Sequence, residues 1–257
     1  MKVIIRYSCN SHTGKCRIMN QDNFICDGRY LNGNQASFTF PLTGTLANAQ
    51  PSIVGVFDGM GGLEHGEIAS FLAAQCAAET PIGENPVDDL LAFCRSANER
   101  ICDYAAETGA SAMGTTAAML VFAENEIILC NIGDSKVFRL SGKKLEQISK
   151  DHCAAAAYGS KSPLSQNLGI PVSDMIIEPY VAKGRYQIGD RYLICSDGLT
   201  DMVSLEEIRS VLVRTEFDKS IDRLLELALE HGGMDNITMI LCKVERKKHS
   251  LFRKKFR

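Results

Sequence analysis

The sequence predicts an α+β fold built from largely antiparallel sheets and pairs of helices. Three observations carry this prediction. Short apolar runs of strand length stand at both ends of the chain and again in its middle. Stretches with helical periodicity occur in two adjacent pairs between them. Strands follow strands instead of alternating with helices, which argues against βαβ units on a parallel sheet.

The first half of the chain contains strand-like runs, two helical stretches and the breakers that separate them. The run SIVGVF at residues 52–57 is continuous and apolar, as expected of a buried strand. The Gly-, Asn- and Gln-rich stretch 32–51 reads as a loop with one short edge strand at residues 38–40. Strands are predicted at 2–9, 24–31 and 52–57, a turn at 20–23, and helices at 64–79 and 87–107.

The second half begins with short β-type runs joined by turn residues such as Asn125 and Gly142. Ser204 and Glu207 form a capping-box pattern where the next helix should begin. Residues 150–168 are small, Ala- and Ser-rich and weakly patterned, so their structure stays open. Strands are predicted at 115–123, 126–132, 135–140, 144–148, 191–195 and 236–244, and helices at 204–215 and 219–231.

Composition indicates an ordinary globular protein. The 257 residues are 45% hydrophobic and 23% charged, with a net charge of -3. That length fits one large domain or two small ones, and the near-balanced charge argues against a general nucleic-acid binder. No apolar run approaches the roughly 18–20 residues needed to span a bilayer, and residues 1–7 lack a cleavage site of small residues. We therefore expect a soluble, cytoplasmic protein without a signal peptide.

The ten cysteines are scattered and include no Cys-x-x-Cys pair. Several lie inside apolar runs, such as Cys130 in IILCNIG and Cys195 in YLICSDG. Cysteine in such a run behaves as a small buried hydrophobe. We expect reduced structural thiols in a reducing cytoplasm, and no zinc site.

Five aspartates stand at the ends of predicted strands, and four of them have glycine beside or close to them. A carboxylate next to a buried strand is costly unless another group compensates its charge. Glycine lets backbone approach a ligand, and hard cations such as Mg²⁺ and Mn²⁺ prefer oxygen ligands. Converging aspartates could hold two metal ions, although an Asp-Gly dipeptide alone indicates a structural turn. The five are Asp22, Asp58, Asp134, Asp197 and Asp235.

In this order and strand context, the series resembles the protein phosphatase type 2C family of metal-dependent serine/threonine phosphatases, in its bacterial form. The resemblance implies a four-layer α-β-β-α sandwich, with two central mainly antiparallel sheets flanked by helices, over residues 1–244. It places a short flap at 153–168 and leaves a basic tail at 245–257. The matching blocks are residues 17–22, 55–62, 114–116, 131–135, 150–152, 195–201 and 233–238.

The resemblance also implies a role for each matching residue at the metal site. Asp58 matches the aspartate that bridges two metal ions, and the Gly59 carbonyl would bind one of them. Asp197 and Asp235 match the other ligands of the first metal. Asp22 matches an acidic residue that holds the second metal directly or through water. Two or three Mn²⁺ or Mg²⁺ ions are the implied cofactors.

Asp134, together with Asp197, matches the site of a weaker third metal. Arg17 matches the arginine that binds the substrate phosphate, and a planar guanidinium suits phosphate oxygens. Arg17 and Asp58 are thus the implied catalytic residues. The implied reaction is hydrolysis of phosphoserine or phosphothreonine by a metal-bridged hydroxide, without a phosphoenzyme. Phosphorylated proteins and a cognate kinase are the expected partners, with no nucleic acid, and the protein is expected to be a monomer.

Two positions depart from the animal-type pattern. Met60 stands where a histidine proposed as general acid is found, and Gln21 stands where a directly ligating glutamate is found. Both substitutions are typical of bacterial members. His65 falls in the first turn of a predicted helix, so we expect no catalytic role for it. His152 should position the turn that leads into the flap.

Three further sites are expected to support or surround the metal centre. Thr115 and Thr116 should do structural work beneath it. Asp201 should either support the metal ligands or begin a helix, and direct metal contact is its less favoured role. The flap is short and Ala-rich, so substrate choice cannot be inferred from the resemblance.

Three alternatives stay open. The chain could be a silent member that binds phosphoproteins, although a protein without activity has no need of all five aspartates. It could hydrolyse small phosphoesters. The basic residues 247–257 could contact a membrane surface, but a solvated tail is the favoured interpretation.

Overall fold

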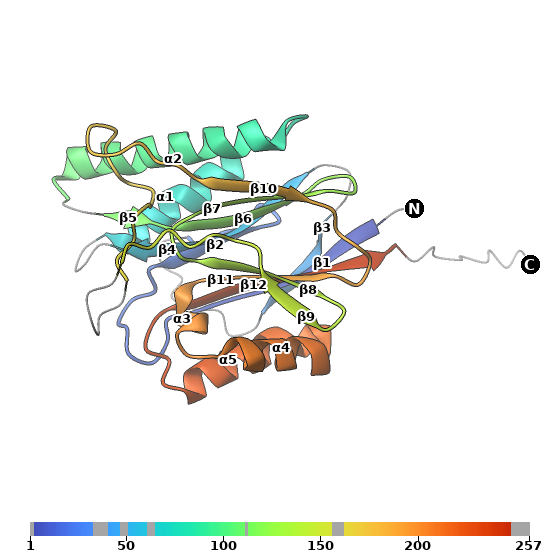
Figure 1. Ribbon diagram of the computed structural model, residues 1–257. Coiled ribbons are helices and arrows are strands. Elements are labelled where there is room, and N and C mark those ends of the chain that lie inside the picture. Colours follow the sequence, from blue (N-terminus) through green and yellow to red (C-terminus); the bar gives the residue numbers. More distant parts are fainter. Residues whose placement is uncertain are drawn as a thin grey trace, which may run out of the picture.

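The computed structural model describes residues 3–32, 41–46, 51–60, 65–110, 113–155 and 162–247. Two β-sheets pack face to face, and a pair of helices covers the outer face of each (Figure 1). Every strand pair is antiparallel. The expected four-layer α-β-β-α sandwich is therefore confirmed.

The first sheet joins strands from both ends of the chain. β1 pairs with β12 over ten residues, and both strands lie inside the sheet and not at its edges. In spatial order the strands are β3 (Leu42–Leu46), β1 (Val3–His12), β12 (Ile237–Arg246), β11 (Arg191–Cys195), β8 (Lys136–Ser141) and β9 (Lys144–Gln147).

The second sheet takes its strands from between residues 22 and 184. A two-residue strand, β5, pairs with the end of β4 and forms a single bridge to Leu168. In spatial order the strands are β10 (Tyr180–Gly184), β7 (Ile127–Ile132), β6 (Ala117–Phe122), β4 (Ser52–Met60) and β2 (Asp22–Cys26), with β5 (Gly114–Thr115) at the β4 end.

Each helix packs an apolar face against a sheet, and the spacing of apolar residues in the sequence accounts for that face. On α5, Ile221, Leu224 and Ala228 are buried at helical spacing. The predicted capping box is present: Ser204 accepts from the Glu207 amide, and the Glu207 side chain accepts in return. The helices are α1 (Gly66–Glu79) and α2 (Pro86–Thr108) over the second sheet, α4 (Leu205–Arg214) and α5 (Phe217–Glu230) over the first, and the short α3 (Asp197–Thr200).

Strand β6 shows why a central strand reads as a continuous apolar run. Its alternate residues Ala118 and Leu120 lie in the core between the sheets. Met119 and Val121 point the other way, into the core beneath α1 and α2. Because both faces of the strand are covered, no position favours a polar side chain.

Several predicted boundaries were wrong by a few residues. β2 ends at Cys26 and not at residue 31, because Asp27 and Gly28 adopt left-handed backbone angles in a tight turn. β12 continues to Arg246, two residues past the predicted end of that strand. An edge strand exists at 42–46, while the expected one at 38–40 lies outside the described residues. β10 and α3 were not predicted.

Seven cysteines are buried, including Cys130 and Cys195, as their apolar runs predict. All ten lie within the described residues, and none forms a disulfide. In the same part of the chain, no helix combines the length and the apolarity that crossing a bilayer requires.

Candidate active site

The five aspartates come together where the chain passes between the two sheets. Asp22 follows the crossing from β1 to β2, and Asp134 lies in the crossing from β7 to β8. Asp197 and Asp235 lie at the ends of β11 and β12 in the first sheet. These segments meet at the end of the sandwich that carries α3 and β5 (Figure 1).

Asp22 and Asp58 are directly opposite each other on the neighbouring strands β2 and β4. Asp22 is buried, and its Oδ2 accepts a 2.7 Å hydrogen bond from the Ser196 hydroxyl. Burial raises the pKa of Asp22 to about 7, against the hydrogen bonds it accepts and with help from Asp197 and Asp235. Two carboxylates in this register repel each other unless a proton or a cation lies near them.

The backbone of Asp58 is held by the two threonines of the Gly-Thr-Thr block. The Asp58 amide donates to Thr116 Oγ1 at 3.0 Å, and its carbonyl accepts from the Thr115 hydroxyl at 2.9 Å. The supporting role expected of these threonines is confirmed. Burial and the four other carboxylates raise the pKa of the Asp58 side chain well above its usual value.

A hollow of about 320 Å³ opens above these strand ends. Asp58, Asp134, Asp197 and Asp235 line it, and Asp22 lies nearby with 3% of its surface exposed. The structure thus brings four of the five predicted aspartates to the lining of one hollow. The described residues that complete the lining are Arg17, Gln21, Gly59, Met60, Thr116, Ser162 and Leu164.

Arg17 supplies positive charge at the edge of the hollow. Its Nη2 lies 2.7 Å from Asp235 Oδ2, and half of its side chain is exposed. The hydrogen bond to Asp235 raises the pKa of the guanidinium, and the charges of Asp58 and Asp197 add to this effect. A half-exposed guanidinium beside a hollow can exchange one oxygen partner for another.

Gln21 and Gly59 bring the loop before β2 against β4. The Gly59 amide donates to the Gln21 carbonyl at 3.1 Å, and Ser70 of α1 donates to the same carbonyl at 2.6 Å. A Cβ on Gly59 would lie 2.1 Å from the Gly66 carbonyl oxygen, so only glycine fits. Met60 follows directly and lines the hollow.

His152 fixes the turn that carries Asp134. Its Nδ1 accepts from the Gly133 amide at 3.2 Å, and its own amide donates to the Gly133 carbonyl at 3.0 Å. Lys136 links the Asp134 carbonyl to Asp151, at 3.1 and 2.7 Å. The structural role expected of His152 is confirmed.

His65 and Asp201 lie at helix ends. His65 is the N-cap residue of α1, and its ring lies edge-on to Tyr104 at 6.4 Å. Asp201 caps the C-terminus of α3, where its amide donates to the Asp197 carbonyl, so it does not begin a helix. Of the two favoured expectations, the supporting role is the one that remains.

Two residues that sequence reasoning left without a role hold the site together. Ser196 binds Asp22, as described above. The Asn236 side chain accepts from the Gln21 amide at 2.8 Å and donates to the carbonyls of Thr13 and Met19 at 2.8 and 2.9 Å. Both residues lie in the blocks that carry the resemblance, directly beside an aspartate, and that position was the available signal.

Gly198 lets α3 pack against the loop residues that directly precede β12. A Cβ on Gly198 would lie 1.9 Å from the Asn236 carbonyl oxygen, which is backbone and cannot turn away. We expect Gly198→Ala to lower the free energy of unfolding by about 2–3 kcal/mol, as measured by urea denaturation. Gly184→Ala is the matched control, because its Cβ would meet only the Ile127 side chain at 3.7 Å. Equal stability of the two variants would contradict this packing.

The donor set fits a hard divalent cation by its chemistry. Carboxylate oxygens gather around one hollow with a single cation, Arg17, among its described lining residues. Within the described part of the chain, no group of three or more Asp, Glu, His or Cys side chains lies in an arrangement that could hold a metal ion as it stands. Arg17 contacts one oxygen of Asp235, and Ser196 contacts one oxygen of Asp22.

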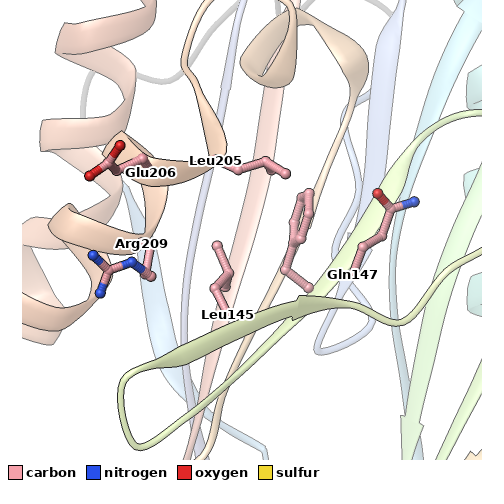
Figure 2. Close-up of a pocket in the computed structure, with 6 residues that line it drawn as sticks. Leu145, Gln147, Leu205, Glu206 and Arg209 are labelled. Atoms are coloured by element: carbon pink, nitrogen blue, oxygen red, sulfur yellow. The ribbon is translucent and has the colours of Figure 1, made fainter.

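A second hollow lies between the β8–β9 hairpin and α4 (Figure 2). Leu145 of the hairpin and Leu205 of α4 line it, together with Glu206 and Arg209 of the same helix. Its lining does not bring carboxylates together, so it does not compete with the first hollow as a site for phosphate chemistry.

Comparison with known proteins agrees with this geometry. The family model described as "Protein phosphatase 2C" matches residues 43–242. The serine/threonine protein phosphatase PstP of Mycobacterium tuberculosis is 33% identical over 94% of this chain and 45% of its own length. The serine/threonine phosphatase stp of Listeria monocytogenes is 29% identical over 75% of this chain and 84% of its own length. The chain therefore spans less than half the length of the curated PstP relatives.

Solved structures extend the likeness to the fold. The crystal structure of Mycobacterium tuberculosis PstP has a TM-score of 0.78 and 30% identity, covering 95% of this chain and 100% of that chain. A structure of the PstP catalytic domain in complex with two manganese ions has a TM-score of 0.77, 31% identity and the same coverage. With matching sequence, matching sheets and the aspartates at one end of them, this chain belongs to the protein phosphatase 2C family.

Proposed function

We propose that the protein is a metal-dependent serine/threonine protein phosphatase of the bacterial type. The observation that carries the proposal is the meeting of four aspartates and Arg17 around one hollow. The manganese ions of the PstP catalytic domain and the named activities of PstP and stp support it.

Each side chain has a task in this proposal. Asp58 would bridge two cations, with the Gly59 carbonyl, Asp197 and Asp235 completing the first site. Asp22 would hold the second cation directly or through water. Bound Mn²⁺ or Mg²⁺ would supply positive charge and lower the pKa of water toward neutrality.

Asp134 and Asp197 would hold a weaker third cation. The Gly133–His152 hydrogen bonds would keep Asp134 at the edge of the hollow. Arg17 would bind two phosphate oxygens and stabilise the charge that develops on them. Met60 has no proton to donate, so the proton for the leaving serine or threonine oxygen must come from another group or from water.

The expected substrates are phosphorylated proteins in the cytoplasm, among them a cognate serine/threonine kinase and the targets of that kinase. We propose that the protein acts as a monomer. The residues at 248–257 lie outside the described part, and their membrane role stays the less favoured alternative.

The test compares a phosphothreonine peptide with small phosphate monoesters, in Mn²⁺ and in chelator. We expect hydrolysis of the peptide that stops in chelator and returns when Mn²⁺ is added. Efficient turnover of small esters without peptide turnover would favour the small-phosphoester hydrolase. Folded protein that binds Mn²⁺ but hydrolyses neither substrate would favour the silent, partner-binding member.

A further inference from the structure

Two loops beside the hollow are tied firmly to each other. Residues 13–21 join β1 to β2, and residues 231–236 join α5 to β12; they run side by side in Figure 1. The Lys15 amide donates to the Gly233 carbonyl at 2.7 Å, and Asn236 binds the Met19 carbonyl from the other loop. With the Arg17–Asp235 ion pair, these contacts hold both loops in one conformation.

Despite this order, the two loops expose large apolar side chains. Ile18 is fully exposed, Met19 is 53% exposed and Met234 is 56% exposed. They are three of the seven exposed large hydrophobic residues in the described part of the chain. Single exposed apolar residues are ordinary, but three on two joined loops indicate a contact surface. We call Ile18, Met19 and Met234 the methionine patch.

The methionine patch lies on the same two loops as Arg17 and Asp235, which line the hollow. Ile18 follows Arg17 directly, and Met234 precedes Asp235. A sulfur contact of 3.5 Å between Cys16 and Met234 joins the two loops on the exposed side. A substrate chain that places its phosphate beside Arg17 must therefore pass near the patch within a few residues, at about 3.3 Å per extended residue.

We propose that the methionine patch binds an apolar side chain of the substrate polypeptide, within three residues of the phosphorylated serine or threonine. This inference rests on the proposed phosphatase function and names its substrate class. Methionine is flexible and polarizable, so the patch should accept Leu, Met or Phe and not one shape alone. Burying such a side chain against the patch removes apolar surface from water on both partners.

The first experiment scans the substrate. A phosphothreonine peptide of Ser and Gly residues receives a single Leu, or a single Gln, at each position from −3 to +3. We expect the wild-type protein with Mn²⁺ to show about a tenfold higher kcat/KM with Leu than with Gln at one or two adjacent positions. No other position should discriminate.

The second experiment changes the patch. In the double variant Ile18→Gln with Met234→Gln, we expect the Leu-to-Gln ratio to fall to about one. Each peptide rate is divided by the rate of the same variant on a small aryl phosphate, so damage to the chemistry cancels. Val172→Gln is the matched control, because Val172 is 71% exposed on a segment that does not line the hollow, and it should keep the tenfold ratio.

The outcomes separate the inference from the function on which it rests. Hydrolysis of every peptide with equal kcat/KM would overturn the role of the patch and leave the phosphatase standing. A Leu preference that survives in the double variant would also overturn it. So would sedimentation showing a wild-type dimer that the double variant abolishes, since the patch would then join two copies. Absence of any peptide hydrolysis would overturn the proposed function itself.

Discussion

Asp58→Asn is expected to lower kcat/KM for a phosphothreonine peptide by about 10³-fold or more, measured in saturating Mn²⁺. Asp58 is the residue proposed to bridge two cations, and its backbone is fixed by Thr115 and Thr116. Asparagine keeps the size of the side chain but removes its charge and one anionic ligand oxygen. The loss therefore measures the positive charge that Asp58 holds in place.

The control is Asp103→Asn, which removes a carboxylate from the exposed face of α2 and not from the hollow. Its kcat/KM should stay within about twofold of wild type, in line with ordinary surface substitutions. A loss of less than tenfold in Asp58→Asn would show that the bridging role is wrong. An equal loss in both variants would point to a general effect of charge.

Asp58→Asn, which is expected to lose activity, should gain thermal stability when chelator is present. Burial and the surrounding carboxylates raise the pKa of Asp58, so at pH 8 the ionised side chain destabilises the fold. The destabilisation appears as pH rises above the usual aspartate range and is absent at low pH, where Asp58 is protonated in both states. In chelator at pH 8, we expect Asp58→Asn to melt above wild type, and at low pH the difference should vanish.

The sequence predicted those parts of the fold that rest on local chemistry. The Ser204–Glu207 capping box and the apolar run that became β4 needed no distant partner. β10 was missed because Tyr180–Gly184 is an edge strand with a weak burial pattern. β2 was predicted too long because the tertiary fold imposes the left-handed backbone angle at Asp27. The aspartate side chain tolerates that angle but does not signal it in the sequence.

For the candidate site, strand context identified the aspartates but not the residues that position them. Asp22 and Asp58 face each other only because β2 and β4 pair in one register, which apolar patterning does not specify to the residue. Ser196 and Asn236 act on residues 174 and 215 positions away. Contacts at that separation arise from the sandwich as a whole, so the sequence signals them only through the position of each residue directly beside a predicted aspartate.

Arg17→Ala is expected to change phosphate binding and metal binding in opposite directions. Loss of two charge-assisted hydrogen bonds to phosphate should lower kcat/KM for the peptide by about 100-fold. Arg17 also pairs with Asp235, which is proposed to bind the first cation, so it competes for that carboxylate. Removing it should tighten Mn²⁺ binding, measured by calorimetry, by up to about fivefold, the scale of a partly exposed ion pair.

Lys15→Ala separates this mechanism from a general loss of charge. Lys15 lies on the same loop, is exposed and carries the same charge, but Arg17 and not Lys15 contacts Asp235. Lys15→Ala should therefore leave both quantities within about twofold of wild type. If Mn²⁺ affinity rises equally in both variants, Arg17 acts only through its positive charge and not through its contact with Asp235. Weaker Mn²⁺ binding in Arg17→Ala would mean that the ion pair orients Asp235 for the cation. Arg17 would then favour Mn²⁺ binding instead of competing with it.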